Sequence, residues 1–358
     1  LQDDAVQTGK LECLFTVEEE IGLNGALGLE PSMISGRMLV NLDTEEVGAV
    51  YIGCAGGKDS YISRQMNQVP PGSGKTAIKL EITSLRGGHS GAEIHKGRAN
   101  ALVLMARTLN QLRKKFTYHI SSIRGGDKHN AIPREAFSEI VVDSREAEGV
   151  QGLFQEYCCK LKNEYSPVED QMAFRAEPAP VPQLVFDSPS TALMANVLMC
   201  IPHGVVAMSR VMEGLVETST NFAYLRTHGG LLDIHLNHRS SIDSALERVC
   251  DIHACITRMA NAHIEHKHGY PGWTPDPQSR LLEHARRAVR NVTGKDAVVR
   301  ATHAGLECGV IKSKFQDMEA VSIGPTIRSP HSPDEKLEIA SVEVFWNILV
   351  QTLKEIAQ

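Results

Sequence analysis

Short apolar runs separated by polar turns dominate the first 57 residues of this 358-residue chain. Runs of this length predict buried strands, here at Leu11–Val17, Met38–Leu42 and Ala49–Ala55, with a short helix over Gly22–Leu29. Strands that alternate with helices are typical of an α/β layer with a largely parallel sheet. In such sheets the reactive groups lie just beyond the carboxyl ends of the strands.

The pattern of apolar and polar residues changes in the middle of the chain, at residues 58–268. This region starts with a polar stretch and a Pro- and Gly-rich turn. Alternating and helical patterns then predict strand, helix, two strands and helix at Thr76–Leu85, Arg98–Lys114, Thr117–Ile123, Glu135–Val142 and Ala147–Asn163. A weaker echo predicts two strands and a helix at Asn221–Arg226, Leu231–Asn237 and Ser241–His263. We therefore expect an inserted α+β domain over 58–268 with an internal duplication.

The first pattern returns after residue 268. It predicts helix, strand, helix, strand and a closing helix at Ser279–Asn291, Ala297–Ala301, Gly305–Lys312, Met318–Ile323 and Ser341–Ile356. The two flanks, 1–57 and 269–358, are therefore expected to form one three-layer αβα domain that the insert interrupts.

Composition narrows the range of functions. A hydrophobic content of 42%, a charged content of 22% and a net charge of −6 are those of an ordinary globular protein, with no basic footprint for nucleic acid or for an anionic membrane. No apolar run approaches the roughly 18 residues that span a bilayer. Eight cysteines without a Cys-x-x-Cys pair favour a reducing, cytoplasmic setting over a disulfide framework.

Two acidic clusters follow predicted strands. Glu18, Glu19 and Glu20 come directly after the first strand, and Asp43 follows the second. Adjacent carboxylates repel one another unless a cation lies between them, although a solvated charge run at a strand-to-helix turn is an alternative interpretation. Zinc binds His nitrogen and carboxylate oxygen, and two-metal hydrolases hold their ions about 3.5–4 Å apart.

The residues around these clusters resemble a known family. Thr16–Ala26 is similar to the Asp-Glu-Glu-x-Gly-x-x-Gly-Ala element of the di-zinc metallopeptidases, which include carnosinases, aminoacylases and glutamate carboxypeptidases. Further similar stretches occur in the family's order along the whole chain, at Asn41–Glu46, Gly53–Gly57, Leu85–Gly91, Asn130–Ala136, Gly214–Asn221, His303–Gly309 and Gly324–Pro333. Within this superfamily the chain most resembles the aminoacyl-histidine dipeptidases.

The resemblance implies roles at the metal site. Glu19 matches the family's general base, Glu20 and His331 match the ligands of one zinc, and Asp43 matches a ligand of the other. Glu18 stands where the family usually has Asp. Taken without the family, a loop residue such as His331 also fits an ordinary surface position.

The resemblance also has a gap. The family's His-x-Asp motif and its metal-bridging Asp would lie ahead of Leu1, so the sequence keeps three of the family's five metal ligands. We therefore expect that an N-terminal part is missing, that the full protein is an enzyme, and that the chain as it stands binds zinc poorly and is inactive.

The insert is expected to supply the substrate contacts. The resemblance implies that three residues of the insert bind substrate: His89 aligns with a lid His that stabilises the oxyanion, Asn130 with a lid Asn that contacts substrate, and Arg239 with a lid Arg that binds the dipeptide's carboxylate. Outside the insert, His303 and Glu307 lie beside the predicted zinc loops and are expected to line the substrate pocket. Without the family, His89 fits an ordinary turn, Asn130 an Asx turn and Arg239 a surface charge.

These matches imply a metallo-dipeptidase that hydrolyses aminoacyl-histidine dipeptides such as carnosine. Its cofactors would be two Zn²⁺ ions, with Co²⁺ or Mn²⁺ able to substitute, and the resemblance leaves room for a homodimer. Two alternatives stay open: a related aminoacylase or tripeptidase, and a catalytically inactive relic or interaction module.

Overall fold

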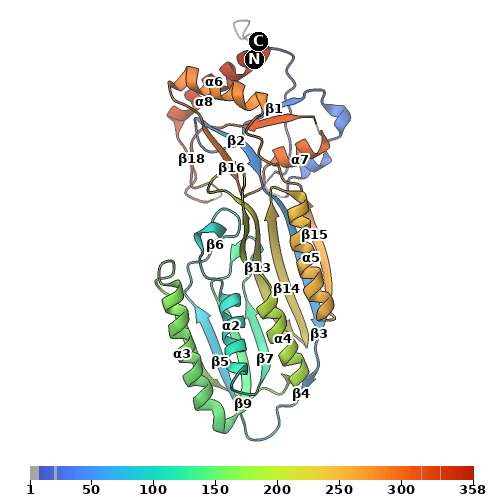
Figure 1. Ribbon diagram of the computed structural model, residues 1–358, viewed down its shortest axis with the longest axis vertical. Helices are drawn as coiled ribbons and strands as arrows, with labels where there is room; N and C mark the ends of the chain where they lie inside the picture. The colour runs from blue at the N-terminus through green and yellow to red at the C-terminus, as the bar shows by residue number, and fades with distance from the viewer. Residues whose placement is uncertain (1–7, 20–21, 316, 331) are drawn as a thin grey trace.

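The computed structural model describes residues 8–19, 22–315, 317–330 and 332–358 (Figure 1). The chain forms two parts that follow one another along the long axis of the molecule, and each part is built on its own sheet. The carboxyl terminus lies at the end formed by the smaller part. No helix in the described parts of the chain is both long and apolar enough to cross a membrane. All eight cysteines are free thiols.

The smaller part contains a four-stranded sheet in the order β1-β17-β2-β16. Its strands are β1 (Met38–Asn41), β2 (Ala49–Cys54), β16 (Val298–Thr302) and β17 (Glu319–Ser322). The pairs β1–β17 and β2–β16 are parallel, as the alternation of strands and helices predicts. Its helices are α1 (Asn24–Gly28), α6 (Arg280–Thr293), α7 (Glu307–Lys314) and α8 (Ile339–Ala357), and a hairpin of β18 (Ile327–Arg328) and β19 (Lys336–Leu337) precedes α8.

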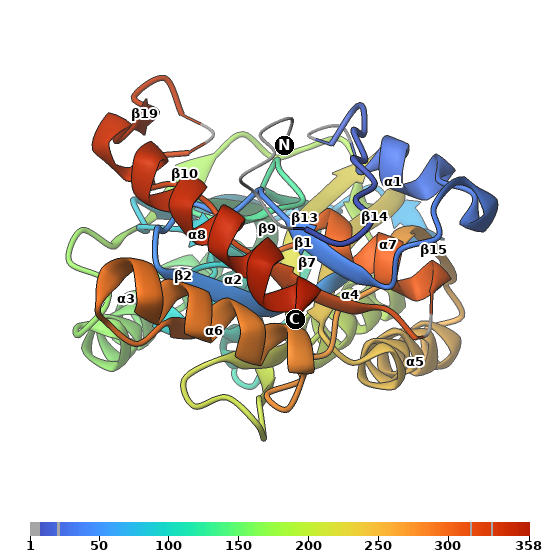
Figure 2. The same ribbon diagram turned by 90° about the horizontal axis from the view of Figure 1, so that it is seen from above.

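Helices cover the small sheet and bury its apolar side chains. Leu282 and Val289 of α6 and Ile348 of α8 pack with Val50 and Ile52 of β2 in one apolar cluster. A second cluster joins α1 to α7 through Leu23, Ala26, Leu29, Val310 and Ile311. Seen from above, α6 and α8 lie together on one side of the strands, and α7 and α1 lie away from them (Figure 2).

The larger part contains one nine-stranded sheet that extends from Gly56 to Tyr270. One half holds β5 (Lys75–Thr83), α2 (Ala101–Arg113), β7 (Tyr118–Gly125), β9 (Ala136–Asp143), α3 (Ala147–Tyr165) and β10 (Ala173–Ala179). The other half holds β3 (Gly56–Gln65), α4 (Ser188–Cys200), β13 (Val216–His228), β14 (Leu231–Ser240), α5 (Asp243–Met259) and β15 (His263–Tyr270). Short strands complete this part: β4 (Gln68–Val69), β6 (Gly88–His89), β8 (Ala131–Ile132), β11 (Val185–Phe186) and β12 (Gly204–Met208).

The two halves of the large sheet repeat one topology. From edge to centre the strand order is β10-β5-β9-β7 in one half and β15-β3-β14-β13 in the other. In both halves the chain runs strand, helix, two strands, helix, strand, and the sequence pattern predicts only the two strands and the helix after them as the repeated part. The halves join where β7 meets β13, in a short antiparallel seam of two residue pairs, Gly125 with Leu225 and Arg124 with Arg226.

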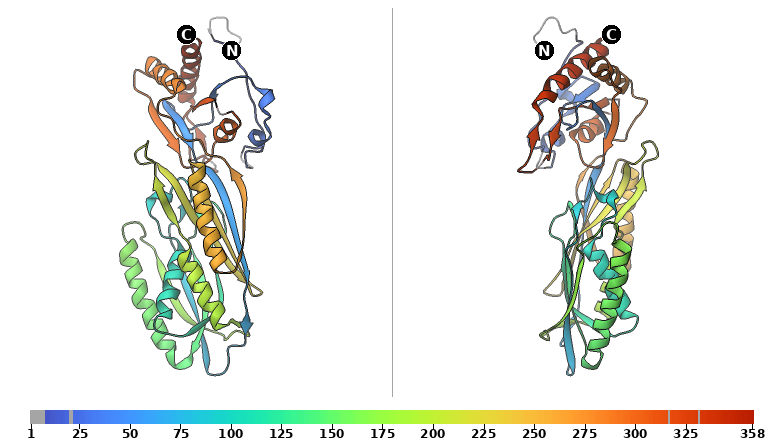
Figure 3. Two further views of the ribbon diagram at one scale, coloured as in Figure 1. Left: turned by 45° about the vertical axis from the view of Figure 1, so that its right-hand side comes forward. Right: turned by 90° about the vertical axis from the view of Figure 1, so that its left-hand side faces the viewer.

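The core of the large part lies between the sheet and its helices, which all pack against one face (Figure 3). Ile78, Leu80 and Ile82 point from β5 into this core, and Leu104 and Leu109 of α2 are fully buried in it. Helix α2 begins at Asn100, whose side-chain oxygen accepts a hydrogen bond from the backbone nitrogen of Leu102 at 2.9 Å. This cap satisfies a helix-end donor that would otherwise be buried without a partner.

Three expectations about secondary structure were wrong or incomplete. Residues 11–17 form no strand, and Phe15 is 89% exposed. Their apolar pattern suits a strand, but a strand also needs a hydrogen-bonded neighbour, and β17 is the partner of β1 in the described sheet. Strands β3 and β15 were not predicted. Strand β3 is difficult to recognise in the sequence because it contains polar residues. Asp59 and Ser60 are buried there and form hydrogen bonds with Asn237 and His238 of β14.

Several of these buried polar residues are histidines. His238 is fully buried, with Nε2 2.7 Å from the Ser60 hydroxyl and Nδ1 2.9 Å from the Thr220 hydroxyl. His253 stacks on it with 4.7 Å between ring centroids. Burial lowers the pKa of His253 to about 4 and lowers the pKa of His238 well below its usual value. Both rings are therefore neutral in the folded protein at pH 7.

This network predicts a loss of stability in weak acid. The unfolded chain binds protons at these histidines near pH 6.5 while the folded protein does not, so the free energy of unfolding falls as the pH drops from 7 toward 4. Each buried histidine contributes up to about 1.4 kcal/mol per pH unit. Urea unfolding between pH 8 and 5 measures how the free energy of unfolding depends on pH. In His253→Gln this dependence should be shallower, by the equivalent of about one proton taken up on unfolding. An unchanged slope would contradict the neutral assignment.

The seam between the halves predicts a sensitive glycine. Gly126 has φ +69°, and a Cβ there would overlap the carbonyl oxygen of Ala223 in β13. Gly126→Ala should lower the free energy of unfolding by about 2–4 kcal/mol in urea titrations. The matched control is Gly152→Ala in α3, where a Cβ meets nothing within 4 Å and a gain of up to about 1 kcal/mol is expected. Equal effects of the two changes would refute the close contact.

Candidate functional site

The acidic turn near the amino terminus is held by backbone contacts. The nitrogen of Gly25 donates to the carbonyl of Val17 at 2.9 Å, and a Cβ on Gly25 would lie 2.5 Å from the Val17 backbone. Only glycine fits this approach. Glu18 adopts a left-handed conformation with φ 56°, and its carboxylate accepts from the Asn24 side chain at 2.9 Å. Glu20, a predicted metal ligand, lies outside the described residues.

A hydrogen bond ties this segment to a residue 291 positions away. The Thr16 hydroxyl donates to Oε2 of Glu307 at 2.7 Å, where Glu307 is the first residue of α7. Burial is the main cause that raises the pKa of the next residue, Cys308. The nearby Cys54 thiol and the carboxylates of Asp43 and Glu307 raise it further. The acidic turn, the Asp43 loop and the start of α7 therefore lie at one place.

The loop after β1 interlocks with the loop after β17. The backbone nitrogen of Ile323 donates to the carbonyl of Asn41 at 3.0 Å, and that of Ile327 donates to Glu45 at 3.2 Å. Gly324 packs so closely on Thr44 that a Cβ would overlap the Thr44 carbonyl oxygen. The segment that leads to residue 331 therefore begins beside the Asp43 loop. His331 itself lies outside the described residues, so the metal that it is predicted to share with Glu20 stays a prediction.

His89 lies in a turn that several short-range hydrogen bonds hold in place. Its Nδ1 accepts hydrogen bonds from the backbone nitrogens of Gly91 and Ala92 at 3.1 and 3.0 Å. A neutral imidazole that accepts at Nδ1 carries its hydrogen on Nε2. The carboxylate of Glu93 accepts from the His89 backbone nitrogen at 3.0 Å and pairs with Arg98 and Lys96. The Lys96 ammonium is the largest cause that lowers the pKa of Glu93 to about 2.

Asn130 lies next to this turn. Its carbonyl oxygen accepts from the backbone nitrogen of Ser90 at 2.9 Å, and the following residue pairs with His89 in the β6–β8 ladder. The Asn221 amide donates to the carbonyl of Ala131 at 2.8 Å, which links this short ladder to the large sheet. Two of the predicted lid residues are thus neighbours.

Arg239 and His303 meet at the junction of the two parts. Arg239, 7% exposed, donates from Nη1 to the Tyr270 hydroxyl at 3.2 Å. His303 lies 2.7 Å from the hydroxyl of Ser219, the residue opposite Arg239 in the β13–β14 ladder. Burial, and next the charge of Arg239, lower the pKa of His303 to about 3, with smaller contributions that include His89. His303 is therefore neutral at pH 7.

Besides His303 Nδ1, four buried side-chain atoms around this junction have no hydrogen-bond partner within the described ranges: Thr44 Oγ1, Asn221 Oδ1, Arg239 Nε and Glu307 Oε1. Buried polar atoms are nearly always paired in folded proteins, and an exception is a sign of an absent ligand or ion. Two of these residues come from the small part and two from the large sheet. The junction therefore contains both hydrogen-bond donors and acceptors that lack partners in the described structure.

The donor types expected at this junction, carboxylate oxygen and imidazole nitrogen, are those that zinc binds. Asp43 offers a carboxylate at the carboxyl end of β1, and the predicted partners Glu20 and His331 complete a carboxylate and imidazole set. Burial raises the pKa of the nearby thiols of Cys54 and Cys308. Among the described residues no three His, Cys, Asp or Glu side chains are arranged to hold a metal.

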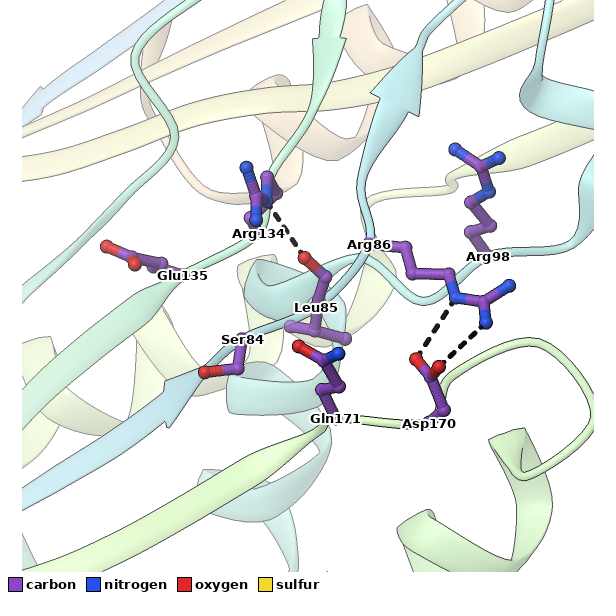
Figure 4. Close-up of a pocket in the computed structure, with 8 residues that line it drawn as sticks. All are labelled: Ser84, Leu85, Arg86, Arg98, Arg134, Glu135, Asp170 and Gln171. Carbon is purple, nitrogen blue, oxygen red and sulfur yellow. Dashed lines mark hydrogen bonds and ion pairs between the residues drawn. The ribbon is translucent and has the colours of Figure 1, made fainter.

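A cavity of about 520 Å³ lies behind the His89 turn, away from this junction. Figure 4 shows its lining, in which Arg86 forms an ion pair with Asp170 at 2.9 Å and Arg134 donates to the carbonyl of Leu85 at 2.9 Å. The stem of Arg134 packs directly on Gly87. None of the predicted site residues lines this cavity, so we do not assign it as the functional site.

Comparisons with known proteins agree with this geometry. A family model described as a peptidase dimerisation domain, of the M20 type, matches residues 80–169. The chain is 37% identical over 356 residues to the cytosol non-specific dipeptidase of Escherichia coli (strain K12), which covers 99% of this chain and 73% of that relative. The crystal structure of aminoacylhistidine dipeptidase from Vibrio alginolyticus matches with a TM-score of 0.91 and 36% identity, over 95% of this chain and 69% of that one.

The chain belongs to the aminoacyl-histidine dipeptidase group of the M20 peptidases. The resemblance inferred from its motifs is thereby confirmed, as is the mixed α/β fold with a peptidase dimerisation domain. Both relatives are named as dipeptidases, so this M20 peptidase is an enzyme of that class.

Sequence reasoning missed three partners in this M20 peptidase. Thr16 and Ser219 were quoted within family motifs without a role, and Tyr270 was taken only as part of a turn at a domain boundary. A signal for Tyr270 exists in hindsight, because Gly57 and Gly305 lack side chains where its ring packs, with a Cβ at either position within 2.9 Å of ring atoms. No local pattern identifies which tyrosine those glycines accommodate.

The interlocked loops predict a second sensitive glycine. Gly324→Ala should displace the loop that carries Asp43 and Thr44, with a loss of about 3 kcal/mol or more in the free energy of unfolding. Hydrogen exchange at residues 41–47 should become faster. Gly28→Ala in α1, where a Cβ meets nothing within 4 Å, is the control and should leave both measurements nearly unchanged. Slow exchange retained in Gly324→Ala would disprove the contact.

Proposed function

We propose that this M20 peptidase hydrolyses the peptide bond of aminoacyl-histidine dipeptides, carnosine among them, in the cytoplasm. The observation that carries the proposal is the buried junction, where Arg239, Asn221, Thr44 and Glu307 hold polar atoms without partners in the described structure. The printed names of the two similar dipeptidases support the reaction type. The small part, 1–57 with 269–358, is proposed as the catalytic domain, and 58–268 as a lid.

Two Zn²⁺ ions, replaceable by Co²⁺ or Mn²⁺, are the proposed cofactors, with Glu20, Asp43 and His331 among their ligands. When bound, such ions supply an activated water near neutral pH and polarise the scissile carbonyl. Asp43 follows β1, at the edge of the small sheet where reactive groups gather in α/β folds.

Glu19 is the proposed general base. Its backbone is fixed in the acidic turn, where its carbonyl accepts from the nitrogen of Leu23 at 3.0 Å. A carboxylate that is not a metal ligand keeps its lone pairs available to take a proton from the attacking water and to pass it to the leaving amine. This role requires Glu19 and Glu20 to differ in coordination although they are adjacent.

The lid residues are proposed to bind substrate. The Nε2–H of His89 would donate to the developing oxyanion, since its Nδ1 is occupied by backbone donors. Arg239, held by Tyr270, would pair with the dipeptide's terminal carboxylate. Asn130 and the neutral His303 would line the pocket. Gly91, two residues after His89, packs against the carbonyl of His303, which favours a lid that acts within its own chain, and the dimerisation-domain match supports a homodimer as well.

The decisive prediction concerns Glu19→Gln in the protein expressed from its whole reading frame. The amide keeps the size of the side chain but cannot accept a proton, so kcat on carnosine should fall about 10²–10⁴-fold while the metal content stays the same. Histidine release and elemental analysis measure the two quantities. The control is Glu148→Gln, an exposed position at the start of α3.

Four results would overturn parts of this proposal. Loss of metal in Glu19→Gln would make Glu19 a ligand, and retained turnover would exclude it as the base. Cleavage of acetylated amino acids without cleavage of carnosine would identify an aminoacylase. A metal-free protein with no hydrolysis of either substrate would support the inactive alternative.

A further inference from the structure

Glu307 is a carboxylate at the junction to which the proposed catalytic scheme gives no specific task. It is 9% exposed, and it begins α7 beside the loop that holds His303. Its Oε2 accepts the hydrogen bond from the Thr16 hydroxyl at 2.7 Å. Its Oε1 is buried and has no hydrogen-bond partner among the residues that the structure describes. One oxygen is therefore anchored and the other is available.

A half-satisfied buried carboxylate is costly. Removing an ionised carboxylate from water costs several kcal/mol unless a cation or several donors replace the water. The nearest histidine in sequence, His303, cannot serve, because burial holds its pKa at about 3 and leaves it neutral. Thr16 supplies a neutral donor and no charge. The unmatched negative charge therefore suits a positively charged ligand.

The position of Glu307 identifies the kind of cation. Thr16 stands two residues before Glu18 and three before Glu19, so the carboxylate lies beside the acidic turn. Arg239, across the junction, is a buried cation with its own unpartnered Nε. A dipeptide zwitterion carries a carboxylate and an ammonium group, which match these two buried charges of opposite sign. A substrate without a free amine would leave the Glu307 carboxylate uncompensated.

We propose that Glu307 binds the free ammonium group of the dipeptide's amino-terminal residue, and that Thr16 orients its carboxylate for this contact. The inference rests on the proposed dipeptidase function and deepens it, because it assigns the selection of free dipeptides over N-acylated amino acids to one side chain. Glu307 contacts substrate in this scheme, and Thr16 is a positioning residue.

The test compares two substrates that differ only in the amine. Carnosine carries an ammonium group on its β-alanyl unit, and N-propionyl-histidine has a hydrogen in its place. The holoenzyme with Glu307 should prefer carnosine by about 100-fold or more in kcat/KM, because a site built around a buried charge rejects a ligand that leaves it unpaired. In Glu307→Gln this preference should fall at least about tenfold, mainly through a higher KM for carnosine.

Control variants separate recognition from folding. Glu307→Asp should recover part of the preference, and Thr16→Val should lower it by a smaller factor than Glu307→Gln. The rate with N-propionyl-histidine and the metal content should change little in Glu307→Gln.

Each other outcome counts against the inference. An equal loss on both substrates would make Glu307 a structural residue, and loss of metal would make it a ligand. A holoenzyme that cleaves neither substrate would instead overturn the proposed dipeptidase function. A variant that fails to fold by circular dichroism leaves the decision to Thr16→Val, whose unchanged preference would refute the positioning role.

Discussion

Close backbone contact at the junction of the two sheets is the constraint on which the rest of the molecule depends. The chain crosses this junction at Gly56 and again at Gly272, and a Cβ on Gly56 would lie 2.5 Å from the Gly272 nitrogen. Gly272 in turn packs on the Ser240 carbonyl. Because the crossings are this tight, the lid strands and the small sheet meet at a defined position. Arg239 and His303, which come from different parts, can therefore face one another.

The junction concentrates polar groups that folding alone would not favour. Buried atoms without partners cost stability, and proteins keep them where a ligand supplies the missing interaction. The pattern here has both signs, with a guanidinium on the lid side and carboxylates on the side of the small sheet. A ligand with opposite charges at its two ends satisfies such a pair better than a neutral one does. This physical argument connects the fold to a small zwitterionic peptide.

The doubled large sheet contributes side chains from both of its halves to the junction. Each half repeats the same strand order, and the seam between β7 and β13 joins them into one sheet. One half carries His89 and Asn130 on the short β6–β8 ladder, and the other carries Arg239 on β14. In the second half, hydroxyl groups of Ser60 and Thr220 lie within hydrogen-bond distance of both ring nitrogens of the buried His238.

The sequence by itself determined the α/β class, the long interruption, most helices and strands, and the motifs that identify the family, because periodicity and short motifs are local properties. It also indicated His89, Asn130, Arg239, His303 and Glu307 through that resemblance, and the structure places them around one junction. Only the tertiary structure decided the partners: Thr16 with Glu307 across 291 positions, Tyr270 with Arg239, and the burial of polar strand β3. The tertiary structure also decided that residues 11–17 pair with no strand of the described structure and stay mostly exposed. Hydrogen bonding and burial depend on which strand becomes a neighbour, and that is settled by the packing of the whole chain and not by any local pattern.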